Sequence, residues 1–120
     1  FNSRLCKFLA IQRQVVICST ISLFSEIHSW NRTNIPGYIE IFLDAPLQAL
    51  LQRDTKGIYK AYNEKKLQNV VGLDIAAEFP LNPDIHVSMK MEMTVEDVES
   101  IVHESILEIL ENDTKRNENS

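Results

Sequence analysis

The residues of this sequence best suited to chemistry are a serine and a group of cations. Ser22 follows an apolar run at residues 15–19, which is typical of a strand buried in a parallel sheet. Ligands bind at the carboxyl ends of such strands, so Ser22 is a candidate for substrate contact. Arg53, Lys56 and Lys60 begin a basic stretch, and in a chain of net negative charge any phosphate site must be built from a few local cations of this kind. Two plainer interpretations stay open: Ser22 caps the following helix, and the lysines form a solvated helix face.

The elements that must position these residues alternate between helix and strand. Apolar spacing predicts strands at residues 15–19, 38–43 and 85–88, and helices at 3–12, within 23–34, from 44 or 45 to 51, and from 94 onward. The last helix is expected to begin at Thr94, because Thr94 and Asp97 have the spacing of a capping box. Alternation of this kind predicts an α/β fold with a mainly parallel sheet. A sheet of three strands is thin, so we expect further elements on the N-terminal side.

A polar stretch at about residues 53–83 is expected to hold a short helix and a long loop, and loops of this length are usually functional. We place one domain at residues 1–111 and a polar, flexible tail at 112–120.

Composition excludes some classes of function. The net charge is -5, and an acidic chain repels phosphate backbones, so we expect no nucleic-acid partner. No apolar stretch approaches the roughly 20 residues that span a bilayer, and no signal peptide is visible, which favours the cytoplasm and no membrane partner. The histidines have no metal-like spacing, so no protein metal site is expected. Cys18 is expected to be a buried free thiol.

Several segments resemble one family in a consistent order along nearly the whole chain. The segment Arg53-Asp54-Thr55-Lys56-Gly57-Ile58-Tyr59 is the most specific of them. The others are Thr20-Ile21-Ser22-Leu23, Glu40-Ile41-Phe42-Leu43-Asp44-Ala45-Pro46, Asn69-Val70-Val71-Gly72-Leu73-Asp74, Glu78-Phe79-Pro80 and Asn82-Pro83-Asp84. Together they resemble the C-terminal part of adenylylsulfate (APS) kinases. The resemblance implies a partial P-loop NTPase-type fold, with three α/β/α layers.

The resemblance also implies a reaction and a set of roles. The ATP γ-phosphate would pass, with Mg²⁺, to the ribose 3′-hydroxyl of APS and give PAPS, the sulfate donor of sulfate assimilation. Ser22 would be the catalytic residue and, with Ile21, would bind the sulfonucleotide. Lys56, Asn69 and Val70 would contact the sulfonucleotide from the lid, and Arg53 with Lys56 would serve the ATP side. The family often forms homodimers.

Three departures from the family pattern shape the alternatives. No GxxxxGK[ST] occurs in these 120 residues, so we expect the phosphate-binding loop to lie outside this chain and the chain to be inactive alone. Val70 stands where the family has a Phe that stacks on adenine, which weakens APS as the acceptor. Leu23 replaces a Pro, and Arg32 is the nearby cation that could replace a missing Arg. The alternatives are a related kinase with another small-molecule acceptor, or a kinase remnant that acts as a binding or assembly module.

Overall fold

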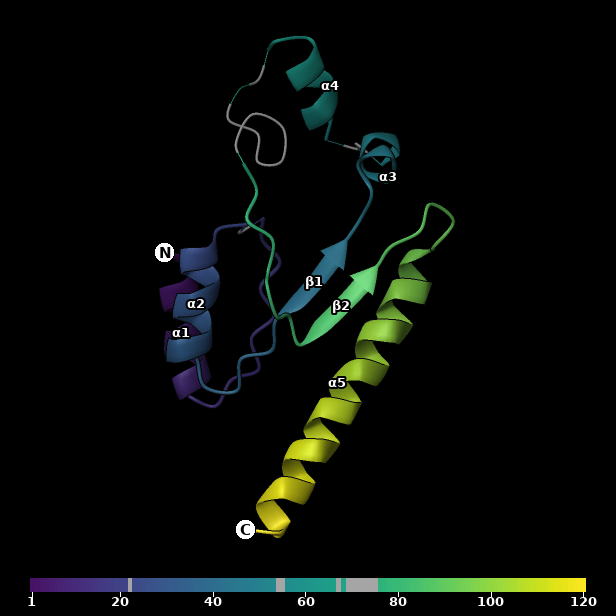
Figure 1. Cartoon of the computed structure of the whole chain (residues 1–120). Helices are drawn as coiled ribbons and strands as arrows, with labels where there is room; N and C mark the ends of the chain where they lie inside the picture. The colour runs from purple at the N-terminus through teal and green to yellow at the C-terminus, as the bar shows by residue number, and fades with distance from the viewer. Residues whose placement is uncertain (22, 54–55, 67, 69–75) are drawn as a thin grey trace. The chain divides into compact units, whose positions relative to one another are not determined.

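The computed structural model describes residues 1–21, 23–53, 56–66, 68 and 76–120. The chain forms two compact units, Phe1–Ile39 with Lys56–Asn82 and Glu40–Thr55 with Pro83–Ser120. The first unit contains α1 (Asn2–Ile11), α2 (Ser25–Asn34) and α4 (Ile58–Asn63) (Figure 1). The second contains β1 (Ile41–Asp44), α3 (Leu47–Gln52), β2 (Ile85–Ser88) and α5 (Val95–Glu118).

The second unit is built on a parallel pair of strands. Ile41 of β1 lies opposite Ile85 of β2, and Asp44 lies opposite Ser88. Pairing extends one residue before β1, because the backbone oxygen of Glu40 accepts from the N–H of Ile85 at 3.0 Å. Figure 1 shows α5 running beside β2, which it contacts. The parallel pairing and the strand at 85–88 confirm the predicted α/β fold, and the strand predicted at 38–43 is shifted to Ile41–Asp44.

The capping box at the start of α5 is confirmed. The Thr94 hydroxyl accepts from the N–H of Asp97 at 3.2 Å, and the Asp97 carboxylate accepts from the N–H of Thr94 at 2.8 Å. The pKa of Asp97 is held below its ordinary value by hydrogen bonds to its carboxylate, first from the Thr94 backbone N–H and second from the Thr94 hydroxyl. The helix continues to Glu118 and so includes residues 112–118 of the polar tail. Lys115 and Arg116 lie in its last turn, where cations favour the helix dipole.

The strand predicted at residues 15–19 is wrong. In the first unit, residues 13–21 have no regular structure, and Val15 and Ile17 are 94% and 93% exposed. A strand needs a partner for its backbone hydrogen bonds, and the described strands β1 and β2 pair with each other in the second unit. Cys18 in this run is free but exposed, so its predicted burial is also wrong.

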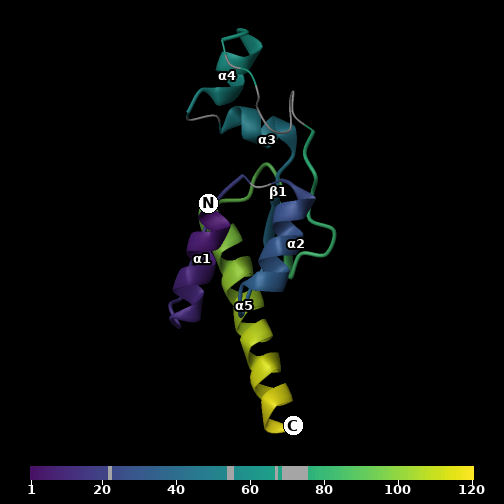
Figure 2. The same ribbon diagram turned by 90° about the vertical axis from the view of Figure 1, so that its left-hand side faces the viewer.

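The helices α1 and α2 lie side by side in the first unit, as the two views in Figures 1 and 2 show. Their bounds agree closely with the helices predicted at 3–12 and within 23–34. The short helix predicted in the polar stretch is α4, and Gly57 forms its N-cap with φ +65. A side chain at that left-handed position would be strained, which explains the Gly of the Lys-Gly pair in the basic motif.

Candidate active site

The predicted acceptor-binding segment leads into α2. Ile21 is 72% exposed, and the next described residue, Leu23, is tied by its backbone oxygen to the N–H of Glu78 at 2.9 Å. Ser22, the predicted catalytic residue, lies outside the described residues. Phe24 occupies the N-cap position of α2 and forms no side-chain capping bond. The backbone N–H of Ser25 instead donates to the carboxylate of Glu78, with 2.5 Å between Ser25 N and Glu78 Oε2.

The electrostatics at the start of α2 favour an ionised Glu78. The pKa of Glu78 lies below its ordinary value, first because its carboxylate accepts from the Ser25 backbone N–H, and second because it bonds to the Ser25 side chain. His28 adds a smaller favourable charge interaction. A carboxylate at this place also interacts favourably with the positive end of the helix dipole.

The two predicted lid cations are placed differently. Arg53 follows α3, and its Nη2 donates to the backbone oxygen of Met93 at 2.6 Å, within the second unit. A guanidinium has five N–H donors, so this bond leaves donors for an anion. Lys56 is exposed in the first unit, directly before Gly57 and α4. Both side chains therefore have the chemistry to contact phosphate oxygens.

The structure describes only part of the predicted site. Asn69 and Val70, the other predicted lid contacts, lie outside the described residues. The cation considered as a replacement, Arg32, lies 5.3 Å from the centre of the Tyr38 ring and donates to the Asn82 backbone oxygen at 3.4 Å. Arg32 thus contributes to packing within the first unit.

A polar pair marks the carboxyl end of β1. Asp44 Oδ2 lies 3.0 Å from His86 Nε2 on the neighbouring strand, and the His86 ring stacks on Phe42 with centroids 5.1 Å apart. Sequence reasoning placed His86 on a strand, which is confirmed, but did not foresee its partner. Among the residues that the structure describes, no three His, Cys, Asp or Glu side chains gather closely enough to hold a metal ion. Mg²⁺ in kinase and ATPase sites is usually bound by one or two carboxylates together with the phosphates of the nucleotide.

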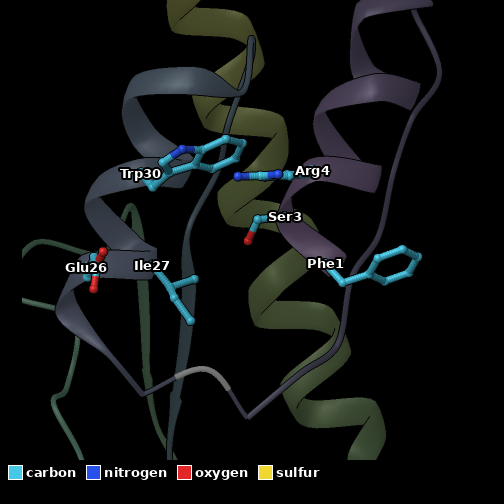
Figure 3. Close-up of a pocket in the computed structure, with 6 residues that line it drawn as sticks. All are labelled: Phe1, Ser3, Arg4, Glu26, Ile27 and Trp30. Carbon is cyan, nitrogen blue, oxygen red and sulfur yellow. The ribbon is translucent and has the colours of Figure 1, made fainter.

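An open pocket of about 320 Å³ lies between α1 and α2 (Figure 3). Its lining residues are Phe1, Ser3, Arg4, Glu26, Ile27 and Trp30. In Figure 3 the Arg4 side chain on α1 points toward the Trp30 ring on α2. Of the predicted site residues that the structure describes, Ile21, Arg53 and Lys56, none lines this pocket.

The parallel strands and the helices that follow them define the class of fold: an α/β arrangement consistent with part of a P-loop NTPase-type domain. The family model for adenylylsulphate kinase matches residues 3–88. The chain therefore belongs to the adenylylsulfate kinase family. The resemblance found from the sequence motifs is confirmed.

The relatives include kinases with different acceptors in their names. A cytidine diphosphoramidate kinase from Campylobacter jejuni is 40% identical over 66% of this chain and 46% of its own length. A probable adenylyl-sulfate kinase from Pseudomonas aeruginosa is 34% identical over 82% of this chain and 46% of its own length. An adenylyl-sulfate kinase from Gloeothece citriformis is 35% identical over 82% of this chain and 56% of its own length. The chain spans about half the length of the curated relatives that it matches.

Glu78 is the residue whose role the sequence did not reveal. It was visible only as the first residue of a Glu-Phe-Pro motif. A signal was nevertheless present: the segment before α2 offers an apolar Phe at the N-cap, so an acceptor for the first N–H groups had to come from elsewhere in the chain.

Proposed function

We propose that the protein transfers the γ-phosphate of ATP, supplied with Mg²⁺, to the ribose 3′-hydroxyl of adenylylsulfate and so forms PAPS for sulfate assimilation. The observation that carries the proposal is the match of residues 3–88 to the adenylylsulphate kinase family. The backbone of Gly57, directly after the exposed Lys56, has a left-handed conformation. This conformation explains why the basic lid motif has a glycine at that position, which supports the proposal. The Mg²⁺ would neutralise phosphate charge when bound with ATP.

The roles of the residues follow from charge and position. Phosphoryl transfer depends mainly on positioning and on stabilising the charge of the transferred group. Lys56 and Arg53 would supply that charge from the lid, with Arg53 already oriented by the Met93 backbone oxygen. Ile21, Ser22, Lys56, Asn69 and Val70 would bind the acceptor, with Ser22 closest to the chemistry. ATP and the acceptor are the proposed partners, with the cytoplasm as location and a homodimer as assembly.

A second acceptor is favoured by one specific observation. Val70 lacks the aromatic ring expected to stack on adenine, and a relative that is 40% identical is named for cytidine diphosphoramidate. Losing one aromatic stack costs on the order of 1 kcal/mol, so a different base in the acceptor is a reasonable consequence. The second candidate is therefore phosphorylation of a cytidine diphosphate derivative by the same lid and the same ATP chemistry.

The test is a kinase assay on the protein expressed from its complete coding region. It would be incubated with ATP, Mg²⁺ and either adenylylsulfate or cytidine diphosphoramidate, and the products separated by anion-exchange chromatography and identified by mass. PAPS formation supports the first proposal, and a phosphorylated cytidine product supports the second. Binding of ATP without either product points to another small-molecule acceptor. Absence of ATP binding refutes both proposals and favours a remnant that acts in binding or assembly.

A further inference from the structure

The start of α2 is stabilised by a residue far away in the sequence. The first N–H groups of a helix have no partner within it and need acceptors from elsewhere. Phe24, at the N-cap, has an apolar side chain and gives no capping bond. Glu78 lies 53 residues after Ser25 in the sequence, and its carboxylate accepts from the Ser25 N–H. Figures 1 and 2 both show the segment of residues 76–82 passing the start of α2.

A second bond joins the same two segments. The backbone N–H of Glu78 donates to the backbone oxygen of Leu23 at 2.9 Å. The side chain of Glu78 bonds to Ser25, and its backbone bonds to Leu23. Together the two bonds fix the distance and the orientation of the two segments. We call this pair of bonds, formed by Leu23, Ser25 and Glu78, the Glu78 clasp.

We propose that Glu78 is a positioning residue: by holding Leu23 and Ser25 it fixes the start of α2 beside the residues that bind the nucleotide acceptor. This inference rests on the proposed function, because it takes Ile21 and Ser22 as acceptor-binding residues. They directly precede Leu23 in the chain. Glu78 lies near the end of the lid-like stretch at 53–83, so the clasp links that stretch to the acceptor-binding segment. Leu23 and Ser25 are already held by the clasp and lose less conformational entropy when a ligand binds beside them, so the clasp favours acceptor affinity.

The groups around Glu78 keep its carboxylate ionised at neutral pH, and the ionised form accepts the Ser25 hydrogen bond. The pKa of its carboxylate is lowered by the Ser25 N–H first, and His28 contributes a weaker interaction. Glu26 is a second acidic residue, in the first turn of α2. Because the folded pKa lies below the unfolded value, the stabilisation is present above the ordinary Glu range and is lost as the pH falls through the folded pKa.

The clasp itself is tested by NMR, independently of any activity. The Ser25 amide resonance is followed from neutral to acidic pH in the wild type, in Glu78→Gln and in a matched control, Glu99→Gln, which changes an exposed glutamate of α5. We expect the Ser25 amide to titrate with a midpoint below that of an ordinary Glu in the wild type and the control. The titration should disappear in Glu78→Gln. An unchanged Ser25 titration in Glu78→Gln would overturn the clasp.

The positioning role is tested by steady-state kinetics on the protein expressed from its complete coding region. We expect Glu78→Ala to raise the acceptor KM about tenfold, equivalent to one lost charged hydrogen bond, while the KM for ATP changes less than about twofold. Glu78→Gln, which keeps an acceptor oxygen, should recover part of the loss, and Glu99→Ala should match the wild type. Equal changes in both KM values, or no change in either, would overturn the positioning role. If the wild type phosphorylated neither adenylylsulfate nor cytidine diphosphoramidate, the proposed function would be overturned, and with it the role of Glu78 in acceptor binding. The Ser25 titration would still decide whether the clasp exists.

Discussion

Truncation of Val87 is the sharpest test of how the second unit is held together. Val87 lies in the middle of β2 and is 2% exposed, and the other buried apolar residues of the described chain are Ala49 and Ile85. Val87→Ala removes two methyl groups from this small core. At about 0.8 kcal/mol for each buried carbon, and with a cavity term added, the free energy of unfolding should fall by about 2 kcal/mol.

Val95→Ala is the matched control, because it makes the same chemical change at a residue that is 73% exposed in the first turn of α5. Its effect should lie within about 0.5 kcal/mol of zero, with a slight gain from the better helix propensity of Ala. Urea unfolding followed by circular dichroism at the helix band measures both variants. For a chain of this size, a loss of about 2 kcal/mol lowers the urea midpoint by about 1–2 M with little change in slope.

Equal midpoints for Val87→Ala and Val95→Ala would refute the reasoning. That result would mean that the pairing of β1, β2 and α5 does not limit the stability of this unit. If the dependence of unfolding free energy on urea concentration fell for Val87→Ala alone, the variant would expose less surface on unfolding. The two free energies of unfolding could then not be compared as a test of the core.

Three further predictions concern the helix cap and the proposed site. Thr94→Ala should cost about 1 kcal/mol of stability at pH 7, with Thr94→Ser close to the wild type in the same urea measurement. The folded pKa of Asp97 is lowered by the hydrogen bonds that its carboxylate accepts from Thr94. The cap should therefore stabilise the fold fully above about pH 4, the ordinary range of Asp. The cost of Thr94→Ala should shrink as the pH falls toward the folded pKa. Lys56→Ala should raise the acceptor KM about tenfold, whereas Lys90→Ala, the same charge change in the other unit, should not; equal KM values would remove Lys56 from the site. Val70→Phe should tighten the binding of adenylylsulfate measured by calorimetry if that is the acceptor, and no gain would count against it.

Sequence reasoning predicted correctly the elements that depend on local patterns, such as apolar spacing along a helix and a capping box. The helix bounds of α1 and α2 followed from apolar spacing, and the start of α5 followed from Thr94 and Asp97, because a capping box needs no distant partner. The strand at 85–88 was also visible, and its parallel pairing followed from the alternation of helices and strands. The family was evident from short motifs, above all the basic segment that ends in Tyr59.

The errors of sequence reasoning occurred where a distant segment decides the outcome. The apolar run at 15–19 has the composition of a buried strand, but composition cannot supply the neighbouring strand that its backbone needs.

The sequence by itself therefore determined the family, the alternating fold class, the cap of α5 and the chemical types of the candidate site residues. Only the tertiary structure decided that Glu78 stabilises the start of α2, that Arg53 is oriented by the Met93 backbone oxygen, and that Asp44 pairs with His86. The reason is physical: each of these contacts joins residues at least 40 positions apart, and a hydrogen bond depends on distance and direction that folding alone sets.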